Sequence, residues 1–392
     1  MSLTTIRLGD LMVSRSGTVN PLDHPDEEFI LYSIPAFDSR RPESITGRDI
    51  GSTKQVVRPG DILLSKIVPH IRRAWVVGEH KGTRIIASSE WIVFRRDDIH
   101  APYLKHVLVG DSFHREFMNT VAGVGGSLLR ARPAHVAKIE VPLPSLTEQK
   151  RIAVLLDQVD VLRAKRRLAI TLLDELAQSL FVDMFAGDSR PWPVVAIEDL
   201  CSVVVDCVNR TAPVVDEVTP FKMIRTTNVR NGRIDLHDVR HVTEETFHRW
   251  NRRAIPQRGD VVFTREAPVG EAGVIETDEP VFLGQRLMLY RPHPDRSTAA
   301  YLATALMSPQ LRAQYEQAGS GSTVKHLSLP TCRKLKVPAP PISAQRDFEA
   351  RTAALRRQKA VHHSQLTALD ELFTSLQQRA FTGTLWEHEA TA

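Results

Sequence analysis

The side chains with the most informative chemistry are cationic and amide residues that occupy matching places in the two halves of the chain. The matching sets are Lys66 with Arg265, Arg95 with Arg291, and Ser88-Ser89-Glu90 with Gly284-Gln285-Arg286. Arginine and glutamine can pair bidentately with guanine and adenine edges, while lysine and arginine elsewhere bind phosphates. For any single residue of these sets, a solvated surface charge is the simpler interpretation. The difference between Glu90 and Arg286 would suit two modules that read different bases.

Motifs of catalysis are missing from the sequence. There is no Gly-x-x-x-x-Gly-Lys-Ser/Thr phosphate loop, no His-Glu-x-x-His and no Asn/Asp-Pro-Pro-Tyr/Phe motif of an adenine methyltransferase. The glycine clusters at 122–127 and 318–323 lack the lysine and a preceding strand, so flexible turns explain them better than a nucleotide cradle. The sequence therefore predicts no catalytic site and no bound metal.

An internal repeat organises the chain. The segment beginning at Ala122 returns at Ala318, an offset of 196 residues, and Leu173-Asp174-Glu175-Leu176 returns at the same offset as Leu369-Asp370-Glu371-Leu372. Upstream the offset is 199, so that Asp61 corresponds to Asp260. A three-residue difference in loop length accounts for the change. A near-constant offset over this distance indicates a tandem duplication.

Each repeat begins with a part that has the pattern of a mixed α+β globule. Short β-prone runs are separated by glycine, proline and aspartate, as is typical of strands. We expect strands at 61–65, 74–77, 91–94, 261–264 and 287–290.

The second part of each repeat has the pattern of a long helix. After Pro142 and Pro144, a segment without glycine or proline runs from Thr147 to Gly187, and its copy starts at Ser343. Leucines at three- and four-residue spacing predict a coiled-coil seam with a polar middle, whereas two ordinary amphipathic helices would be the alternative. At about 1.5 Å per residue such helices span on the order of 55 Å, so they need partners outside the globules.

Bulk composition limits the function classes. The 392 residues suggest more than one domain, and the composition of 42% hydrophobic and 25% charged residues is that of a globular protein. No apolar run reaches a membrane span and no signal peptide is evident, so a cytoplasmic protein without a membrane role is expected. Three cysteines without metal-site spacing argue against disulfides and zinc. A net charge of +5 is compatible with a polyanionic partner.

Two segments of the sequence resemble conserved regions of the specificity (S) subunits of Type I restriction-modification enzymes. The first is Pro-Leu-Pro-Ser-Leu-Thr-Glu-Gln-Lys-Arg-Ile-Ala at 142–153, followed by Leu-Asp-Glu-Leu at 173–176, and the second lies at 372–385. The order of module, helix, module, helix covers the whole chain. The second proline-glutamine segment departs from the pattern, with Ala344 where the first repeat has Glu148.

The resemblance implies a fold class of two tandem mixed α/β target recognition domains, each followed by a long helix, with the helices pairing as an antiparallel coiled coil. The expected boundaries are 1–145, 146–187, 188–341 and 342–392. The implied partners are double-stranded DNA, two modification (methyltransferase) subunits and, for cleavage, restriction subunits. No cofactor is expected in this chain, since S-adenosylmethionine, ATP and Mg²⁺ would belong to those partners.

Candidate site residues follow from these interpretations. The candidate DNA-binding residues are Lys66, Arg72, Arg73, Arg95, Arg130, Arg225, Arg265, Gln285, Arg286 and Lys325. The candidate subunit-interface residues, which are also expected to hold the helix pair, are Ile152, Leu155, Leu162, Leu173, Leu176, Leu180, Leu369, Leu372 and Leu376. Two other readings stay open: a divergent, duplicated DNA methyltransferase or nuclease, and a coiled-coil interaction scaffold. The bases recognised cannot be read from the sequence.

Overall fold

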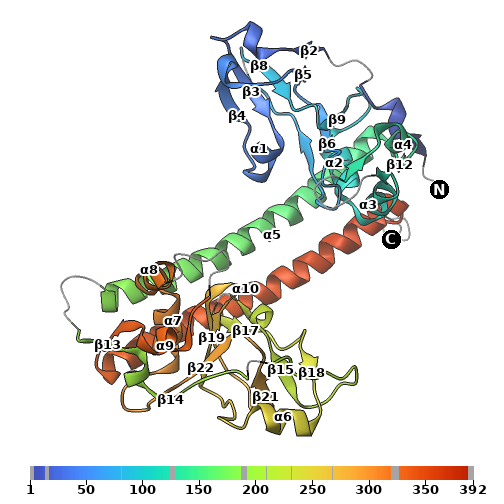
Figure 1. Ribbon diagram of the computed structural model, residues 1–392. Helices are drawn as coiled ribbons and strands as arrows, with labels where there is room; N and C mark the ends of the chain where they lie inside the picture. Colours follow the sequence, from blue (N-terminus) through green and yellow to red (C-terminus); the bar gives the residue numbers. More distant parts are fainter. Residues whose placement is uncertain are drawn as a thin grey trace. The chain divides into compact units, whose positions relative to one another are not determined.

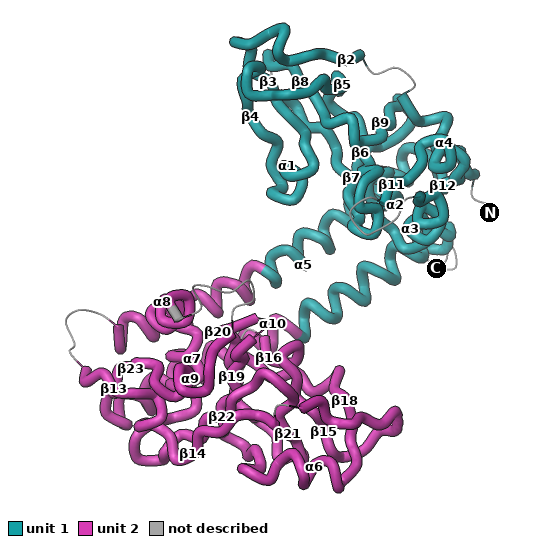
Figure 2. The backbone as a smooth tube through the Cα atoms, viewed as in Figure 1, with its two compact units in different colours: residues 1–167, 364–392 teal, residues 168–363 magenta. Residues whose placement is uncertain are grey.

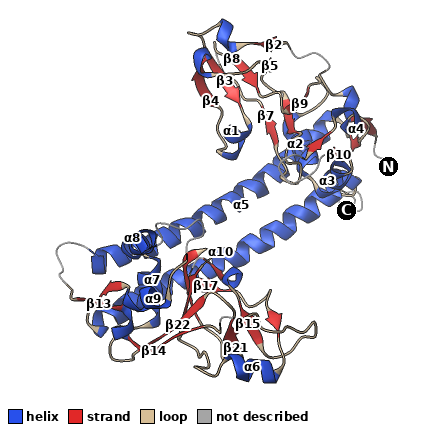
Figure 3. Cartoon of the chain, in the orientation of Figure 1, coloured by secondary structure: helices blue, strands red, loops and turns tan. Residues whose placement is uncertain are grey.

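The computed structural model describes residues 4–13, 17–80, 82–122, 129–186, 192–208, 210–230, 232–266, 268–318 and 326–386. The chain forms two compact units, Met1–Arg167 with Ser364–Ala392 (unit 1) and Leu168–His363 (unit 2), which Figure 2 draws in teal and magenta. Both units mix helix and sheet (Figure 3). Among the described residues, no helix combines the length and apolar character that crossing a membrane requires.

Unit 1 contains a five-stranded sheet, a three-stranded sheet and two strand pairs (Figure 1). The orders are β2-β5-β8-β3-β4, β7-β6-β9, β1-β12 and β10-β11. The strands are β1 Thr5–Arg7, β2 Thr18–Val19, β3 Glu28–Tyr32, β4 Glu43–Thr46, β5 Lys54–Val56, β6 Ile62–Ser65, β7 Ala74–Val76, β8 Arg84–Ala87, β9 Trp91–Phe94, β10 Val121–Ala122, β11 Arg130–Ala131 and β12 Glu140–Pro142. The short helices are α1 Ile34–Asp38, α2 Ala101–Val109, α3 Asp111–Met118 and α4 Pro133–Val136.

Unit 2 contains a four-stranded sheet, a three-stranded sheet and two strand pairs. The orders are β14-β22-β19-β20, β18-β15-β21, β13-β23 and β16-β17. The strands are β13 Val194–Ala196, β14 Cys201–Asp206, β15 Lys222–Ile224, β16 Val229–Arg230, β17 Arg233–Ile234, β18 Arg240–His241, β19 Val261–Arg265, β20 Val269–Val274, β21 Val281–Leu283, β22 Leu287–Pro292 and β23 Lys336–Pro338. The shorter helices are α6 Glu244–Trp250, α7 Ala299–Met307, α8 Pro309–Ala318 and α9 Leu329–Lys334.

Two long helices follow the globular parts: α5 (Leu146–Phe181, 36 residues) and α10 (Ile342–Thr382, 41 residues). Helix α5 starts after the prolines at the predicted place, where the Ser145 hydroxyl accepts a hydrogen bond from Glu148 N at 3.3 Å. It changes to a π-helical turn at Val182–Ala186, before Gly187. Each unit includes part of both helices, so the helices do not form a compact unit of their own.

The predicted strands of both repeats are confirmed. Strands β6, β9 and β19 are buried along their whole length, as continuous apolar runs lead one to expect. The turn before β6 and the turn before β19 both contain a glycine in the left-handed region, Gly60 with φ 85° and Gly259 with φ 90°. A residue without Cβ is favoured there, which explains the repeated Gly-Asp.

The main core of unit 1 joins its globule to both helices. Ile62, Phe94 and Leu104 of the globule pack in one cluster with Ile152 and Leu156 of α5, and α10 adds its own apolar residues to the same cluster. In unit 2 the corresponding cluster joins β19, β22 and α7 to Phe181 of α5 and Phe348 of α10. The helices are therefore part of the folded cores.

Candidate nucleic-acid interface

In unit 1, Lys66 and Glu90, which the repeat singles out, meet the candidate DNA-binding residue Arg130 at the turn between β8 and β9. The backbone N of Lys66 donates to Glu90 O at 3.0 Å, and Ala131 N donates to Lys66 O at 2.8 Å. An Arg130 guanidinium nitrogen lies 3.2 Å from Glu90 Oε1, and Lys66 Nζ lies 3.9 Å from Glu90 Oε2. We call Lys66, Glu90 and Arg130 the turn cluster of unit 1.

Unit 2 has the same backbone frame at the turn between β21 and β22. Arg265 N donates to Arg286 O at 2.9 Å and Leu327 N donates to Arg265 O at 3.1 Å. The isolated bridge between Ile67 and Arg130 in unit 1 has its equivalent between Glu266 and His326 in unit 2.

The charges on this frame are rearranged in unit 2. The acidic residue is Glu266, which follows Arg265, and an arginine, Arg286, takes the place that Glu90 has in unit 1. Arg286 Nε lies 3.2 Å and His326 Nδ1 3.5 Å from Glu266 Oε2. We call Glu266, Arg286 and His326 the turn cluster of unit 2.

In both turn clusters the acidic side chain is largely covered, while Arg130 in unit 1 and Arg286 and His326 in unit 2 are exposed; Lys66 is as covered as Glu90. The side chain of Arg130 is 60% exposed and that of Arg286 is 52% exposed, compared with 23% for Glu90 and 20% for Glu266. The exposed chemistry is therefore cationic and rich in hydrogen-bond donors. It matches the acceptor atoms of phosphates and of guanine.

Two candidate DNA-binding arginines are instead used inside the fold. Arg73, whose side chain is 8% exposed, forms a bidentate pair with Asp38 at 2.8 and 2.9 Å. Arg265 is buried, and it donates to Leu327 O at 3.4 Å. The sequence does not reveal this burial, and we leave both arginines out of the interface.

Arg95 has a structural role that both repeats share. It forms a bidentate pair with the buried Asp61 at 2.5 and 2.6 Å, and Arg291 forms the same pair with Asp260 at 2.8 and 2.8 Å. The hydrogen bonds to aspartate raise the pKa of both guanidinium groups. We therefore assign Arg95 to the framework and not to the interface.

Of the remaining candidates, two lie apart from the turn clusters, one adjoins the turn cluster of unit 2, and one lies outside the described residues. Arg72 pairs with Asp111 at 2.6 Å, and Arg225 lies 3.7 Å from Asp238. Gln285 is half-buried beside Arg286 in the same turn. Lys325 lies outside the described residues.

Glu266 and His326 were not among the predicted residues. The repeat contained a signal for His326, because adding the offset of 196 to Arg130 leads to it. Glu266 carries no such signal, since its counterpart at an offset of 199 is Ile67.

Each globule is attached to its helix by the same anchor. The buried Gln149 accepts from His100 N at 2.8 Å and donates to Asp98 O and Pro144 O at 3.2 and 3.0 Å. Gln345 does the same in unit 2, with Thr298 N at 3.0 Å and with Arg296 O and Pro340 O at 2.9 Å each. A buried amide with all these partners fixes the start of each helix against its globule.

Within each unit the two helices are joined by a half-buried ion pair, and in unit 1 Arg167 of α5 adds a second contact to Asp370 at 3.2 Å. In unit 1, Arg163 Nε of α5 lies 2.5 Å from Asp370 of α10, and in unit 2, Lys359 Nζ of α10 lies 2.5 Å from Asp174 of α5. The two pairs occupy equivalent places, because Arg163 and Lys359 are 196 residues apart, as are Asp174 and Asp370.

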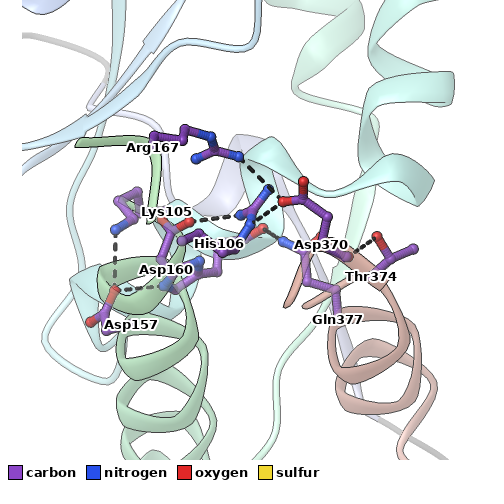
Figure 4. A network of polar contacts seen from close by, with 9 residues as sticks. Lys105, His106, Asp157, Asp160, Arg167, Asp370, Thr374 and Gln377 are labelled. Carbon is purple, nitrogen blue, oxygen red and sulfur yellow. Dashed lines mark hydrogen bonds and ion pairs between the residues drawn. The ribbon is translucent and has the colours of Figure 1, made fainter. Parts of the chain in front are cut away.

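A polar network in unit 1 extends from this ion pair to the globule (Figure 4). His106 Nε2 of α2 lies 2.7 Å from Asp157 of α5, and Gln377 of α10 donates to His106 O at 3.4 Å. Burial lowers the pKa of His106, with Lys105 acting in the same direction and against the opposing effect of Asp157. His106 Nδ1 is buried without a partner in the described residues, which also favours the neutral ring.

The candidate interface leucines divide into covered and exposed groups. Ile152 is buried, while Leu155, Leu173, Leu180, Leu369 and Leu376 are half-buried. Leu162, Leu176 and Leu372 are exposed by 43%, 51% and 46%. These three do not hold the helices together within a unit, so they remain candidates for contact with another chain.

The fold and these sites define a mixed helix and sheet protein with long helices and no His/Cys/Asp/Glu group suited to a metal ion among the described residues. Two solved structures share the fold over nearly the full length. One is the S subunit of the Type-I restriction-modification system from M. genitalium, 12% identical with a TM-score of 0.58, covering 96% of both chains. The other comes from work on complex assembly and conformational transition of the type I R-M system, 19% identical with a TM-score of 0.56, covering 98% of both.

Sequence relationships agree with the fold. Residues 189–354 match the family model of the Type I restriction modification DNA specificity domain. The specificity subunit of the Type I restriction enzyme EcoBI of Escherichia coli is 22% identical over 277 residues, which is 62% of this chain and 58% of that relative. The chain matches somewhat more than half the length of such curated relatives. The match over residues 189–354 and these relatives bear out the resemblance of the sequence to specificity subunits of Type I restriction-modification enzymes.

Proposed function

We propose that this chain is the DNA sequence-specificity subunit of a Type I restriction-modification complex and has no catalytic site of its own. The observation that carries the proposal is the pair of turn clusters: one backbone frame occurs in both units, and each presents a different set of exposed cations. The specificity-domain match and the specificity-subunit relative support the same conclusion.

The proposed target is an asymmetric, bipartite site in double-stranded DNA, with one part read by each globular unit acting as a target recognition domain. Reading two half-sites from one face of B-DNA puts their centres roughly 10 base pairs apart. Exchange of residues 1–140 for the first module of another specificity subunit tests this. Methylation mapping should then find one half of the recognised sequence changed and the other kept. A change of both halves, or of neither, would refute independent readers.

We further propose that α5 and α10 pair antiparallel as a coiled-coil spacer. The equivalent ion pairs Arg163 with Asp370 and Lys359 with Asp174 support this arrangement. Insertion of four residues near Arg166 and four near His362 would lengthen the spacer by roughly 6 Å. Both half-sequences should be kept while the unread gap grows by about one or two base pairs at roughly 3.4 Å each. An unchanged gap would mean that the helices do not set the spacing.

The proposed partners are two modification (methyltransferase) subunits and, for DNA cleavage, restriction subunits, all in the cytoplasm. Exposed apolar side chains on the helices, Leu162, Leu176 and Leu372 among them, support such docking, because burial of exposed apolar surface stabilises protein contacts. S-adenosylmethionine, ATP and Mg²⁺ would be bound by the partners. Binding of S-adenosylmethionine by the purified chain alone would favour the rival assignment as a methyltransferase, and DNA binding that does not weaken with salt would favour a protein scaffold.

A further inference from the structure

We propose that one arginine of each turn cluster reads a guanine, Arg130 in the first module and Arg286 in the second, and that Glu90 and Glu266 are the positioning residues. The inference rests on the proposed function, since it names the base-reading side chains of the two recognition units. The two arginines occupy different positions of the shared frame, so each module presents its guanidinium from a different strand end.

The first argument is the way each arginine is held. A carboxylate that is about one-fifth exposed lies 3.2 Å from a guanidinium that is more than half exposed, in both units. The carboxylate fixes part of the guanidinium group, and a guanidinium has five N–H donors, so several remain for a ligand. A fixed fork of donors suits the O6 and N7 acceptors of guanine in the major groove.

The second argument is the backbone at Arg286. Its φ of 71° lies in the left-handed region, which a long side chain adopts at a cost and which glycine would occupy freely. Neither Glu90 nor Ser89, the corresponding turn residues of unit 1, has a positive φ. A strained backbone conformation at an arginine indicates that its side chain has a function.

The third argument is that the frame itself is fixed by backbone contacts, so the side chains can change without moving it. The bridges between Ile67 and Arg130 and between Glu266 and His326 hold equivalent strand ends together. Arg130 and His326 are 196 residues apart, as are Glu90 and Arg286. Two modules that read different DNA sequences require different side chains on the same backbone. The exchange of acidic and basic residues between the two turn clusters meets that requirement.

The test is selection of bound sequences from a pool of randomised duplex DNA by the full chain, with Arg286→Gln and Arg286→Lys compared with the wild type. Lysine keeps the charge but cannot make the bidentate pair. Arg286→Lys should therefore lose discrimination at one position of one half-site by roughly 10-fold or more, and Arg286→Gln should shift that position from guanine towards adenine. Arg130→Gln should do the same at one position of the other half-site.

Matched controls separate base reading from loss of charge. Arg258 is 56% exposed and paired with Asp278, and Arg48 is 61% exposed and paired with Asp26. Arg258→Gln in unit 2 and Arg48→Gln in unit 1 should leave the selected sequence unchanged. Glu266→Gln should weaken discrimination at the same position as Arg286→Lys, and the double variant should show no further loss, because the two residues act as one unit.

The outcomes are distinguishable. If the wild type selects a bipartite sequence and the Arg286 and Arg130 variants select that same sequence with uniformly lower affinity, these arginines bind phosphate and the inference fails. If Glu266→Gln changes a different position from Arg286→Lys, Glu266 is not its positioning residue. If the wild-type chain selects no sequence, the proposed function itself fails.

Discussion

Units 1 and 2 are alike where their globules meet the helices and differ in the side chains of their turn clusters. The anchor of Gln149 is repeated by Gln345, and the hydroxyl of Tyr103, which donates to Pro142 O at 2.9 Å, is matched by that of Tyr301, which donates to Pro338 O. The turn clusters, in contrast, keep their backbone contacts but exchange acidic and basic side chains. The comparison teaches that the attachment was kept after duplication while the presented chemistry was free to change.

A second difference lies inside the globules. Trp75 pairs with Leu63 in the register of β6 and β7, and the equivalent residue in unit 2 is Gly273, which pairs with Val262. A Cβ added at Gly273 would come within 2.9 Å of the Arg233 backbone. In unit 1, Trp75 packs instead against the ring of Tyr32, with centroids 4.5 Å apart. The two globules thus complete the same strand pair with different neighbours.

The prediction with the largest expected effect tests whether α5 and α10 bind modification subunits in the same way. Leu176 in unit 2 and Leu372 in unit 1 are equivalent and exposed. We expect Leu176→Asp to leave a complex with one modification subunit, and Leu176→Asp with Leu372→Asp to leave none, because a charge opposes burial of the leucine site. Native mass spectrometry of the co-purified complex measures this.

Leu22→Asp is the matched control, since Leu22 is 50% exposed in a 3-10 turn, Pro21–Asp23, of the globule of unit 1 and not on a long helix. It should leave assembly intact. Recovery of a complete complex with the doubly substituted chain would mean that these leucines are not the docking surface.

The prediction with the next largest effect tests the buried arginine–aspartate ion pair that occurs in both units. Asp61→Asn and Asp260→Asn should each destabilise their own unit by about 2 to 3 kcal/mol, since loss of a buried partner leaves an uncompensated arginine. The effect should fall below that of a fully buried pair because the side chains of Arg95 and Arg291 are 33% and 25% exposed. Native-state hydrogen exchange at β6 and β19 reports each unit separately.

Asp278→Asn is the control for this pair, because Asp278 is 78% exposed beside Arg258 and an ion pair at the surface contributes little to stability. If Asp61→Asn and Asp260→Asn destabilised their units by strongly unequal amounts, the two ion pairs would not be equivalent in the two units.

The smallest effect tests a feature of unit 1 alone. The pKa of His106 is lowered in the folded chain, so protonation favours the unfolded state. The stability contributed by neutral His106 is present above the ordinary histidine pKa of about 6.5 and is lost as the pH falls through that value towards the lower folded pKa. We expect unit 1 to lose stability from this group as the pH falls from 7 to 5, because the unfolded chain binds a proton at His106 more readily than the folded chain does.

His106→Thr introduces the residue found at the corresponding place of α7, Thr304, and should remove that part of the pH dependence. Hydrogen exchange of the α2 amides at both pH values checks it. An unchanged pH dependence in the variant would assign the effect to other groups, such as Asp157, Asp160 or Lys105, which face His106.

Much of the fold could be predicted from sequence because its signals are local or periodic. The buried strands at 62–65 and 261–265 and the starts of both long helices follow from apolar runs and prolines. The interface was harder to predict, because a basic residue looks the same in sequence whether it is exposed, like Arg130, or paired inside the fold, like Arg73. Contacts such as that of Glu266 with His326 join residues far apart in the chain, and no periodic pattern in the sequence predicts them.

The repeated ion pairs of the long helices have one further consequence, which concerns alignment errors. Successive residues of an α-helix are rotated by about 100°, since a turn holds 3.6 residues. A slip of α10 along α5 by a single residue would therefore swing Asp370 away from Arg163 in unit 1 and, independently, Lys359 away from Asp174 in unit 2. Intermediate alignments form neither ion pair. Each unit therefore favours the native alignment of the two helices through its own ion pair, and the alignments that keep the ion pairs form a discrete set.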